Sequence, residues 1–202
     1  MIAIIDYGMG NLYSVHKAFA KLGVETIITS DAAVIEAAER VVLPGVGAFG
    51  DCMKNLKGYQ LVDVICHVIK RGTPFLGICL GLQLLFEGSE EDPDVEGLKV
   101  FPGMVRKIEA PGFKIPHMGW NSLEFGSESQ LFTGLPNHSY VYFVHSYHAV
   151  PTESGIITAV ADYGGPVTAA VGYRNVQAVQ FHPEKSSSIG LKILANFKEM
   201  SL

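Results

Sequence analysis

The chain has 202 residues, enough for one full-sized hydrophobic core and few for two independent domains. Hydrophobic residues make up 48% of it and charged residues 17%, with a formal net charge of −5 and no cluster of lysine and arginine. This balance argues against binding to nucleic acid or to an anionic membrane surface.

The start of the chain and its cysteines predict a cytoplasmic protein. No cationic segment precedes the first apolar run, MIAII, so we expect no signal peptide. The longest apolar stretch, around residues 75–86, contains Gln83 and is too short to cross a bilayer. Cys52, Cys66 and Cys79 form no Cys-x-x-Cys pair, so we expect free thiols and neither a disulfide framework nor a metal site.

The first half alternates between strand and helix patterns, which predicts parallel crossovers in an α/β sheet. Asn11 is a plausible N-cap, Gly23 a helix stop, and Asp31 the start of a short helix. Between residues 43 and 75 one or two helices are expected, the clearer at 60–71. The remaining predictions are strands at 1–6, 24–29, 41–43 and 75–78, and helices at 11–22 and 80–87.

The second half is strand-rich, with glycine, proline and asparagine turns that indicate antiparallel additions to the sheet. A helix at 189–200 ends the chain. No linker or repeat interrupts residues 1–202, so we expect one domain. The predicted strands of this half are 99–101, 104–108, 140–145, 157–161, 168–172 and 177–181.

The sequence Gly77-Ile78-Cys79-Leu80-Gly81 lies where a strand meets a helix, which is typical of a nucleophile elbow. The turn brings strand and helix so close that only glycine fits two residues before and two after the nucleophile. It also places the thiol at a helix N-terminus and at the carboxyl edge of the sheet, where open α/β sheets bind ligands. We therefore predict Cys79 as a nucleophile, against the alternative of a buried structural cysteine.

A base and its orienting acid are predicted at His182 and Glu184. The strand at 177–181 would deliver His182 to the same sheet edge, and Glu184 is close enough in sequence to accept a hydrogen bond from the imidazole. His145 and His148 also lie at a strand end. They are weaker candidates because no acid is near them in sequence.

The run Gly45-Val46-Gly47-Ala48-Phe49-Gly50 matches the dinucleotide-binding pattern literally, so a nucleotide-binding module is one alternative. A dinucleotide site needs an acid at the end of the next strand, and that strand ends in Cys79. We favour a second use of the run, as backbone donors to an oxyanion. Val46, Gly47 and Leu80 are the candidate donors.

Three motifs together resemble the class I (triad) glutamine amidotransferases: Pro-Gly-Val-Gly at 44–47, the Cys79 elbow with Gln83, and Phe-His-Pro-Glu at 181–184. The segments PHMGWN at 116–121, FVHSY at 143–147 and EKSS at 184–187 are similar to the glutaminase subunits of imidazole glycerol phosphate synthase. Glutaminases of anthranilate and GMP synthesis share the triad and remain alternatives, but we do not expect the PHMGWN segment in them.

The resemblance implies a glutaminase that forms a Cys thioester without a cofactor. It also implies a heterodimer with a (βα)₈-barrel cyclase, which uses the ammonia to make imidazole glycerol phosphate and an aminoimidazole-carboxamide ribotide in histidine biosynthesis. The glutamine pocket would include Gln83, Glu91, Ser146 and Tyr147. The partner-facing surface would include His117, Trp120, Asn121 and Tyr142. A free-standing glutaminase or γ-glutamyl hydrolase is a further alternative.

Overall fold

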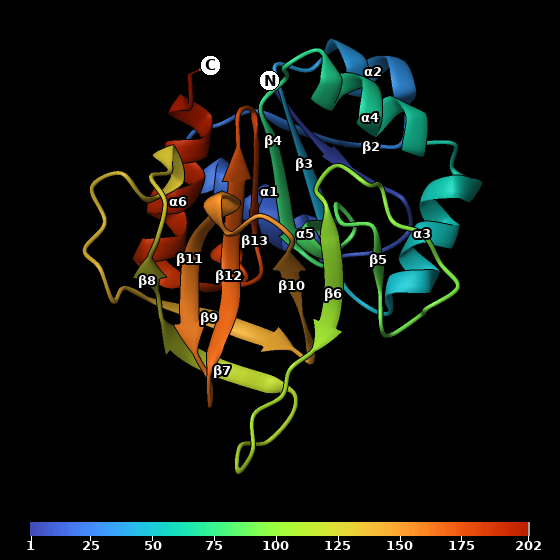
Figure 1. Ribbon diagram of the computed structural model, residues 1–202. Coiled ribbons are helices and arrows are strands. Elements are labelled where there is room, and N and C mark those ends of the chain that lie inside the picture. The colour runs from blue at the N-terminus through green and yellow to red at the C-terminus, as the bar shows by residue number, and fades with distance from the viewer. Residues whose placement is uncertain (202) are drawn as a thin grey trace.

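A twisted mixed sheet forms the middle of the molecule and carries helices on both faces (Figure 1). The computed structural model describes residues 1–201. Within these residues the sheet has eight strands, in the order β2-β1-β3-β4-β13-β12-β11-β8. The strands from β2 to β13 are parallel to one another, and β12, β11 and β8 are added antiparallel. The predicted fold class, a mostly parallel sheet with antiparallel additions, is confirmed.

The bounds of the main sheet follow the predicted pattern closely at its centre. The parallel strands are β1 (Ile2–Ile5), β2 (Thr26–Thr29), β3 (Arg40–Gly45), β4 (Phe75–Cys79) and β13 (Val176–Val179). The antiparallel strands are β8 (Glu124–Phe125), β11 (Ile157–Asp162) and β12 (Pro166–Tyr173).

Two hydrophobic layers flank the sheet because successive side chains of a strand point to opposite faces. In β1, Ala3 and Ile5 belong to one layer, whereas Ile2 and Ile4 belong to the other. Both faces are buried, which explains why the parallel strands are continuous apolar runs in sequence. Against the first layer pack α2 (Ala32–Ala37), α3 (Phe49–Gly58) and α4 (Val62–Lys70). Against the second pack α1 (Leu12–Lys21) and α6 (Ser187–Glu199).

The predicted helix starts are confirmed by their capping contacts. Asn11 accepts a hydrogen bond from the Ser14 amide through its side chain, and Asp31 accepts from the amides of Ala33 and Val34. Side-chain oxygens in this position satisfy N–H groups that have no partner within the helix.

Two small sheets lie beside the carboxyl edge of the parallel strands (Figure 1). The first contains β10 (Tyr147–Pro151), β6 (Gly103–Lys107) and β5 (Gly88–Ser89). The second pairs β7 (His117–Ser122) antiparallel with β9 (Tyr140–His145), and His117 lies opposite His145. Short 3₁₀ turns complete the chain at Gln130–Phe132, Ser154–Ile156 and Pro183–Lys185 (η1, η2 and η3).

The segment 99–101, predicted as a strand, forms an irregular loop, and the prediction was wrong. The helix predicted at 80–87 is also shorter, because α5 covers only Leu80–Gln83. Both differences have one cause. The amides of residues 98–101 donate to the carbonyls of Leu84, Leu85 and Phe86, so this loop closes the turns that follow α5.

Candidate active site

Cys79 is the last residue of β4 and directly precedes α5. Its backbone has φ 56° and ψ −111°, a conformation that residues other than glycine seldom adopt. A Cβ atom on Gly77 would lie 2.7 Å from the carbonyl oxygen of Gly81, and one on Gly81 would overlap the carbonyl oxygen of Leu43. Both glycines are therefore required on steric grounds, and the expected elbow is present.

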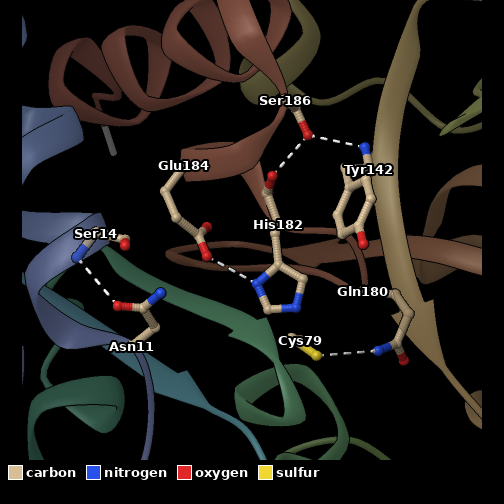
Figure 2. Close-up of polar contacts among 8 residues, drawn as sticks. All are labelled: Asn11, Ser14, Cys79, Tyr142, Gln180, His182, Glu184 and Ser186. Carbon is tan, nitrogen blue, oxygen red and sulfur yellow. Dashed lines mark hydrogen bonds and ion pairs between the residues drawn. The ribbon is translucent and has the colours of Figure 1, made fainter. Parts of the chain in front are cut away.

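His182 and Glu184 form a buried pair immediately after β13. The Nδ1 atom of His182 lies 2.7 Å from Oε1 of Glu184, and their side chains are 3% and 2% exposed. The η3 turn, which begins at Pro183, directs the Glu184 carboxylate back to the imidazole (Figure 2). A carboxylate only accepts hydrogen bonds, so Nδ1 carries the proton and Nε2 is left for chemistry.

The strand order brings the thiol and the imidazole together, because β13 pairs parallel with β4. The imidazole of His182 lies next to the sulfur of Cys79, and its Nε2 is buried without a hydrogen-bond partner among residues 1–201 (Figure 2). Burial opposes protonation of His182, but the attraction of Cys79 and Glu184 outweighs it and raises the pKa of His182 to about 9. The imidazole is therefore protonated at neutral pH and can act as an acid.

The segment that carries His182 is held against β9 by Ser186. The Ser186 hydroxyl donates to the carbonyl of His182 at 2.6 Å and accepts from the amide of Tyr142 at 3.0 Å (Figure 2). This contact joins the base to the strand that carries His145 and precedes Ser146.

A cavity of about 330 Å³ opens beside Cys79 and His182. The three residues expected to stabilise an oxyanion and the four expected to bind glutamine all line it. Pro116, Val144 and His145, which were not among the residues predicted to line the pocket, complete the wall. The predicted residues in the wall are Val46, Gly47, Leu80, Gln83, Glu91, Ser146 and Tyr147.

Two of the predicted pocket residues also make structural contacts. Gln83 donates through Nε2 to the carbonyl of Tyr147 and to Oε1 of Gln180, both at 3.0 Å. Glu91 accepts from the amide of Phe49 at 2.9 Å and so caps the N-terminus of α3. These contacts hold both side chains in place in the cavity wall.

The glycine-rich run 45–50 is not arranged for phosphate. It leads into α3, whose first amides already donate to carboxylates: Phe49 to Glu91, and Gly50 to Asp92 at 2.7 Å. A phosphate would need these donors and would meet two negative charges instead. Gly47 has φ 106°, a conformation suited to glycine, and it faces the Cys79 cavity.

The four residues expected at a partner-facing surface differ in exposure. Trp120 on β7 is 52% exposed and lies edge-on to Tyr142 of β9, with ring centroids 6.2 Å apart. Asn121 is half-buried and donates to the carbonyl of Asp162. His117 does not face solvent, which corrects the expectation for this residue: it is 2% exposed because it stacks between Phe143 and Tyr163.

Sequence reasoning missed Gln180, whose Nε2 donates to the sulfur of Cys79 at 3.8 Å (Figure 2). The available signal was its position two residues before His182, on the same side of an extended segment. His145 was considered only as a base. The structure places it in the cavity wall, where Nδ1 contacts the carbonyl of Tyr147 at 2.8 Å.

A metal-binding cluster and a membrane-spanning helix are both absent from the part of the chain that the structure describes. No group of three or more histidine, cysteine or acidic side chains in residues 1–201 is arranged to hold a metal ion. In the same residues, no helix has the length and apolar character needed to cross a membrane.

Comparison with known proteins agrees with this geometry. The family model "Glutamine amidotransferase class-I" matches residues 3–200. The imidazole glycerol phosphate synthase subunit HisH of Syntrophotalea carbinolica is 50% identical, covering 99% of this chain and 100% of its own. The subunit of the same name from Moorella thermoacetica is 52% identical, covering 98% and 94%.

Solved structures share the fold at low sequence identity. A crystal structure of a glutamine amidotransferase superposes with a TM-score of 0.77 at 18% identity, covering 98% of both chains. The glutaminase domain of Trypanosoma brucei CTPS with bound acivicin gives a TM-score of 0.67 at 18% identity, covering 100% of this chain and 94% of its own. With the family match over almost the whole chain and full-length relatives at about half identity, the chain belongs to the class-I glutamine amidotransferase family.

Proposed function

We propose that this chain is the glutaminase subunit of an imidazole glycerol phosphate synthase and supplies ammonia for histidine biosynthesis. The main observation in support of this reaction is the position of the Cys79 thiol, which lies at an elbow and shares a cavity with His182. His182 in turn forms a buried pair with Glu184. The synthase assignment rests on relatives named as its HisH subunit, which are about half identical over nearly the whole chain.

In the proposed reaction the Cys79 thiolate attacks the side-chain amide carbon of glutamine. The protonated His182 gives its proton to the leaving nitrogen, so ammonia departs and a thioester remains on the sulfur. Neutral His182 then takes a proton from water, and the hydroxide attacks the thioester carbon. The intermediate then collapses and glutamate leaves, which restores the Cys79 thiolate and the protonated His182. Glu184 holds the imidazole in the tautomer that both steps need.

The tetrahedral intermediates carry a negative oxygen, which backbone N–H groups would stabilise. We assign this role to Leu80, at the start of α5, and to Val46 and Gly47, which follow β3 and line the same cavity. Removal of one such donor typically costs roughly 3 kcal/mol of barrier.

Gln83, Glu91, Ser146 and Tyr147 are proposed to bind glutamine. Gln83 has one buried oxygen, Oε1, without a hydrogen-bond partner among the described residues, so this atom is left for a ligand. Glu91 brings a negative charge, which suits the ammonium group of a free amino acid.

The proposed partner is a (βα)₈-barrel cyclase that forms a heterodimer with this single domain, residues 1–202, in the cytoplasm. It would dock against β7 and β9, where Trp120 and Met118 are 52% and 61% exposed and Tyr142 lies beside them. Ammonia is protonated in neutral water and then no longer nucleophilic, which favours direct transfer between the two active sites.

The test is glutamate release by the purified complex, with the nucleotide acceptor present. Cys79→Ala should abolish it, whereas Cys66→Ala, which removes a thiol on α4, should not. Undiminished turnover by Cys79→Ala would reject the proposed nucleophile. Trp120→Ala should weaken association with the cyclase, and Tyr173→Ala, which removes an equally exposed aromatic at the far end of the sheet, is its control.

Two alternative functions predict different results when the partner enzyme is changed or left out. Efficient transfer of ammonia to an anthranilate or GMP synthase partner, and none to the cyclase, would replace the histidine-pathway assignment. Full glutaminase activity of the isolated chain, equal to that of the complex, would indicate a free-standing hydrolase.

A further inference from the structure

A run of buried and partly buried hydrogen bonds connects strand β7 to the sulfur of Cys79. It begins at Asn121, whose Nδ2 lies 3.3 Å from Nε2 of His117, and Nδ1 of His117 lies 2.9 Å from Nε2 of His145. Nδ1 of His145 contacts the carbonyl oxygen of Tyr147 at 2.8 Å.

The same carbonyl oxygen accepts a second hydrogen bond, from Nε2 of Gln83 at 3.0 Å. Gln83 also donates to Oε1 of Gln180, and Nε2 of Gln180 donates to the Cys79 sulfur at 3.8 Å. A carbonyl oxygen has two lone pairs, so Tyr147 can accept from both sides.

The direction of every bond in this run is determined by its ends. The Tyr147 carbonyl can only accept, so Nδ1 of His145 carries the proton. Burial lowers the pKa of His145 to about 3 and that of His117 to about 4, so both rings are neutral and each has one proton. Nε2 of His145 therefore accepts from Nδ1 of His117, and Nε2 of His117 accepts from Asn121.

The orientation of the Gln180 amide follows in the same way. Gln83 presents an N–H group to Gln180, because its Nε2 must donate to the Tyr147 carbonyl. Gln180 therefore accepts this hydrogen bond through its side-chain oxygen, so its side-chain nitrogen points to the sulfur of Cys79. Reversal of the Gln180 amide would bring two N–H groups together and place an oxygen against the sulfur.

We propose that His117, His145, Gln83 and Gln180 form one positioning chain that fixes an N–H donor on the nucleophilic sulfur of Cys79. The donor favours the thiolate, because hydrogen bonds to a charged acceptor are stronger than neutral ones. His117 and His145 act through the other members and are positioning residues. This inference deepens the proposed function and rests on it, but the hydrogen-bonded chain can be tested without glutamine.

The test measures alkylation of Cys79 by iodoacetamide on the acid limb of its pH–rate profile, where the rate follows the fraction of thiolate. Mass spectrometry of the peptide that contains Cys79 gives the rate. Gln180→Met keeps the side-chain volume and removes the donor, and it should slow alkylation about tenfold. The matched control is Gln177→Met, because Gln177 is a buried glutamine of β13, the strand that leads to Gln180, and it accepts from Ser129. An unchanged rate in Gln180→Met would overturn the proposal.

Two substitutions of His117 separate positioning from packing. His117→Phe keeps an aromatic ring between Phe143 and Tyr163 but removes the hydrogen bonds, whereas His117→Asn keeps a donor near Nδ1 but loses the stacking. We expect His117→Phe to slow alkylation about threefold and His117→Asn to recover at least half of that loss. The reverse ranking would show that His117 serves packing alone and would reject its place in the chain.

Tyr163→Phe is the control for the stack, because it keeps the ring and removes only the hydroxyl bond to the Lys114 carbonyl. Glutaminase activity of the complex is measured in parallel, with kcat expected to fall and KM to change little for Gln180→Met. If alkylation responds as expected but the parent protein does not hydrolyse glutamine, the proposed function fails while the positioning chain stands.

Discussion

His182 and Glu184 are two residues apart in sequence, and their side chains meet at 2.7 Å with almost no exposure to solvent. Glu184→Gln removes the negative charge while it keeps the shape. We expect kcat for glutamate release to fall about 10²–10⁴-fold, because the amide can stabilise the wrong tautomer of His182 and no longer favours its protonated form. The measurement is steady-state turnover of the cyclase complex. A loss of less than threefold would contradict the role of Glu184.

The three buried histidines predict a stability maximum near neutral pH. Because burial lowers the pKa values of His117 and His145, the unfolded state binds more protons than the folded state below about pH 6.5. The free energy of unfolding should therefore decrease as the pH falls from about 6.5 towards 4, with a slope of at most roughly 1.4 kcal/mol per pH unit for each histidine.

Above neutral pH, His182 should make the free energy of unfolding decrease as the pH rises. Burial opposes its charge, but Cys79 and Glu184 raise its pKa to about 9, so the folded state binds the extra proton between about pH 6.5 and 9. Its contribution is complete below about pH 6.5 and is lost as the pH rises through 9. Urea unfolding from pH 4.5 to 9.5 checks both limbs. His182→Asn should flatten the alkaline limb, and a slope that survives this substitution would refute the assignment.

Gly81 is expected to tolerate no side chain, because a Cβ atom would overlap the carbonyl oxygen of Leu43. Gly81→Ala should destabilise the protein by about 3 kcal/mol or more, or prevent folding. Gly58→Ala, at the end of α3 with no atom within 4 Å of the new Cβ, should be neutral or slightly stabilising. Thermal unfolding of the two variants distinguishes these outcomes, and equal effects would contradict the steric argument.

Glu91 and Asp92 permit a test of binding against capping, since both accept from the first amides of α3 but only Glu91 lines the cavity. Glu91→Gln and Asp92→Asn should each cost about 1 kcal/mol of stability. Only Glu91→Gln should also raise KM for glutamine, by about tenfold or more, because a charge-assisted contact is lost. If Glu91→Gln and Asp92→Asn have the same KM for glutamine, Glu91 serves only to cap α3.

The catalytic residues were predictable because their signals are local. Gly77 and Gly81 lie two residues on either side of Cys79, the carbonyl of Gly81 is what requires glycine at position 77, and Glu184 reaches His182 within one turn. The central strands were predictable for a related reason, since burial on both faces leaves continuous apolar runs.

The features that could not be predicted depend on contacts with residues that are distant in sequence. Gln180 acquires its orientation from Gln83, a residue 97 positions earlier, and nothing in its neighbourhood indicates this. Strand β7 was missed because its large apolar side chains, Met118 and Trp120, are exposed and Gly119 has φ 129°, so only the pairing with β9 makes it a strand. The buried position of His117 has the same origin.

Strand β13 pairs with β4, so the two catalytic side chains meet only after both strands have been synthesised. The nucleophile is synthesised about 100 residues before its base, and β13, the strand that leads to the base, enters the sheet between β4 and β12 after the other strands have been synthesised. A growing or truncated chain that stops short of His182 therefore possesses a thiol but no proton donor. Such a chain is therefore expected to release no ammonia from glutamine, because the leaving nitrogen cannot be protonated by His182.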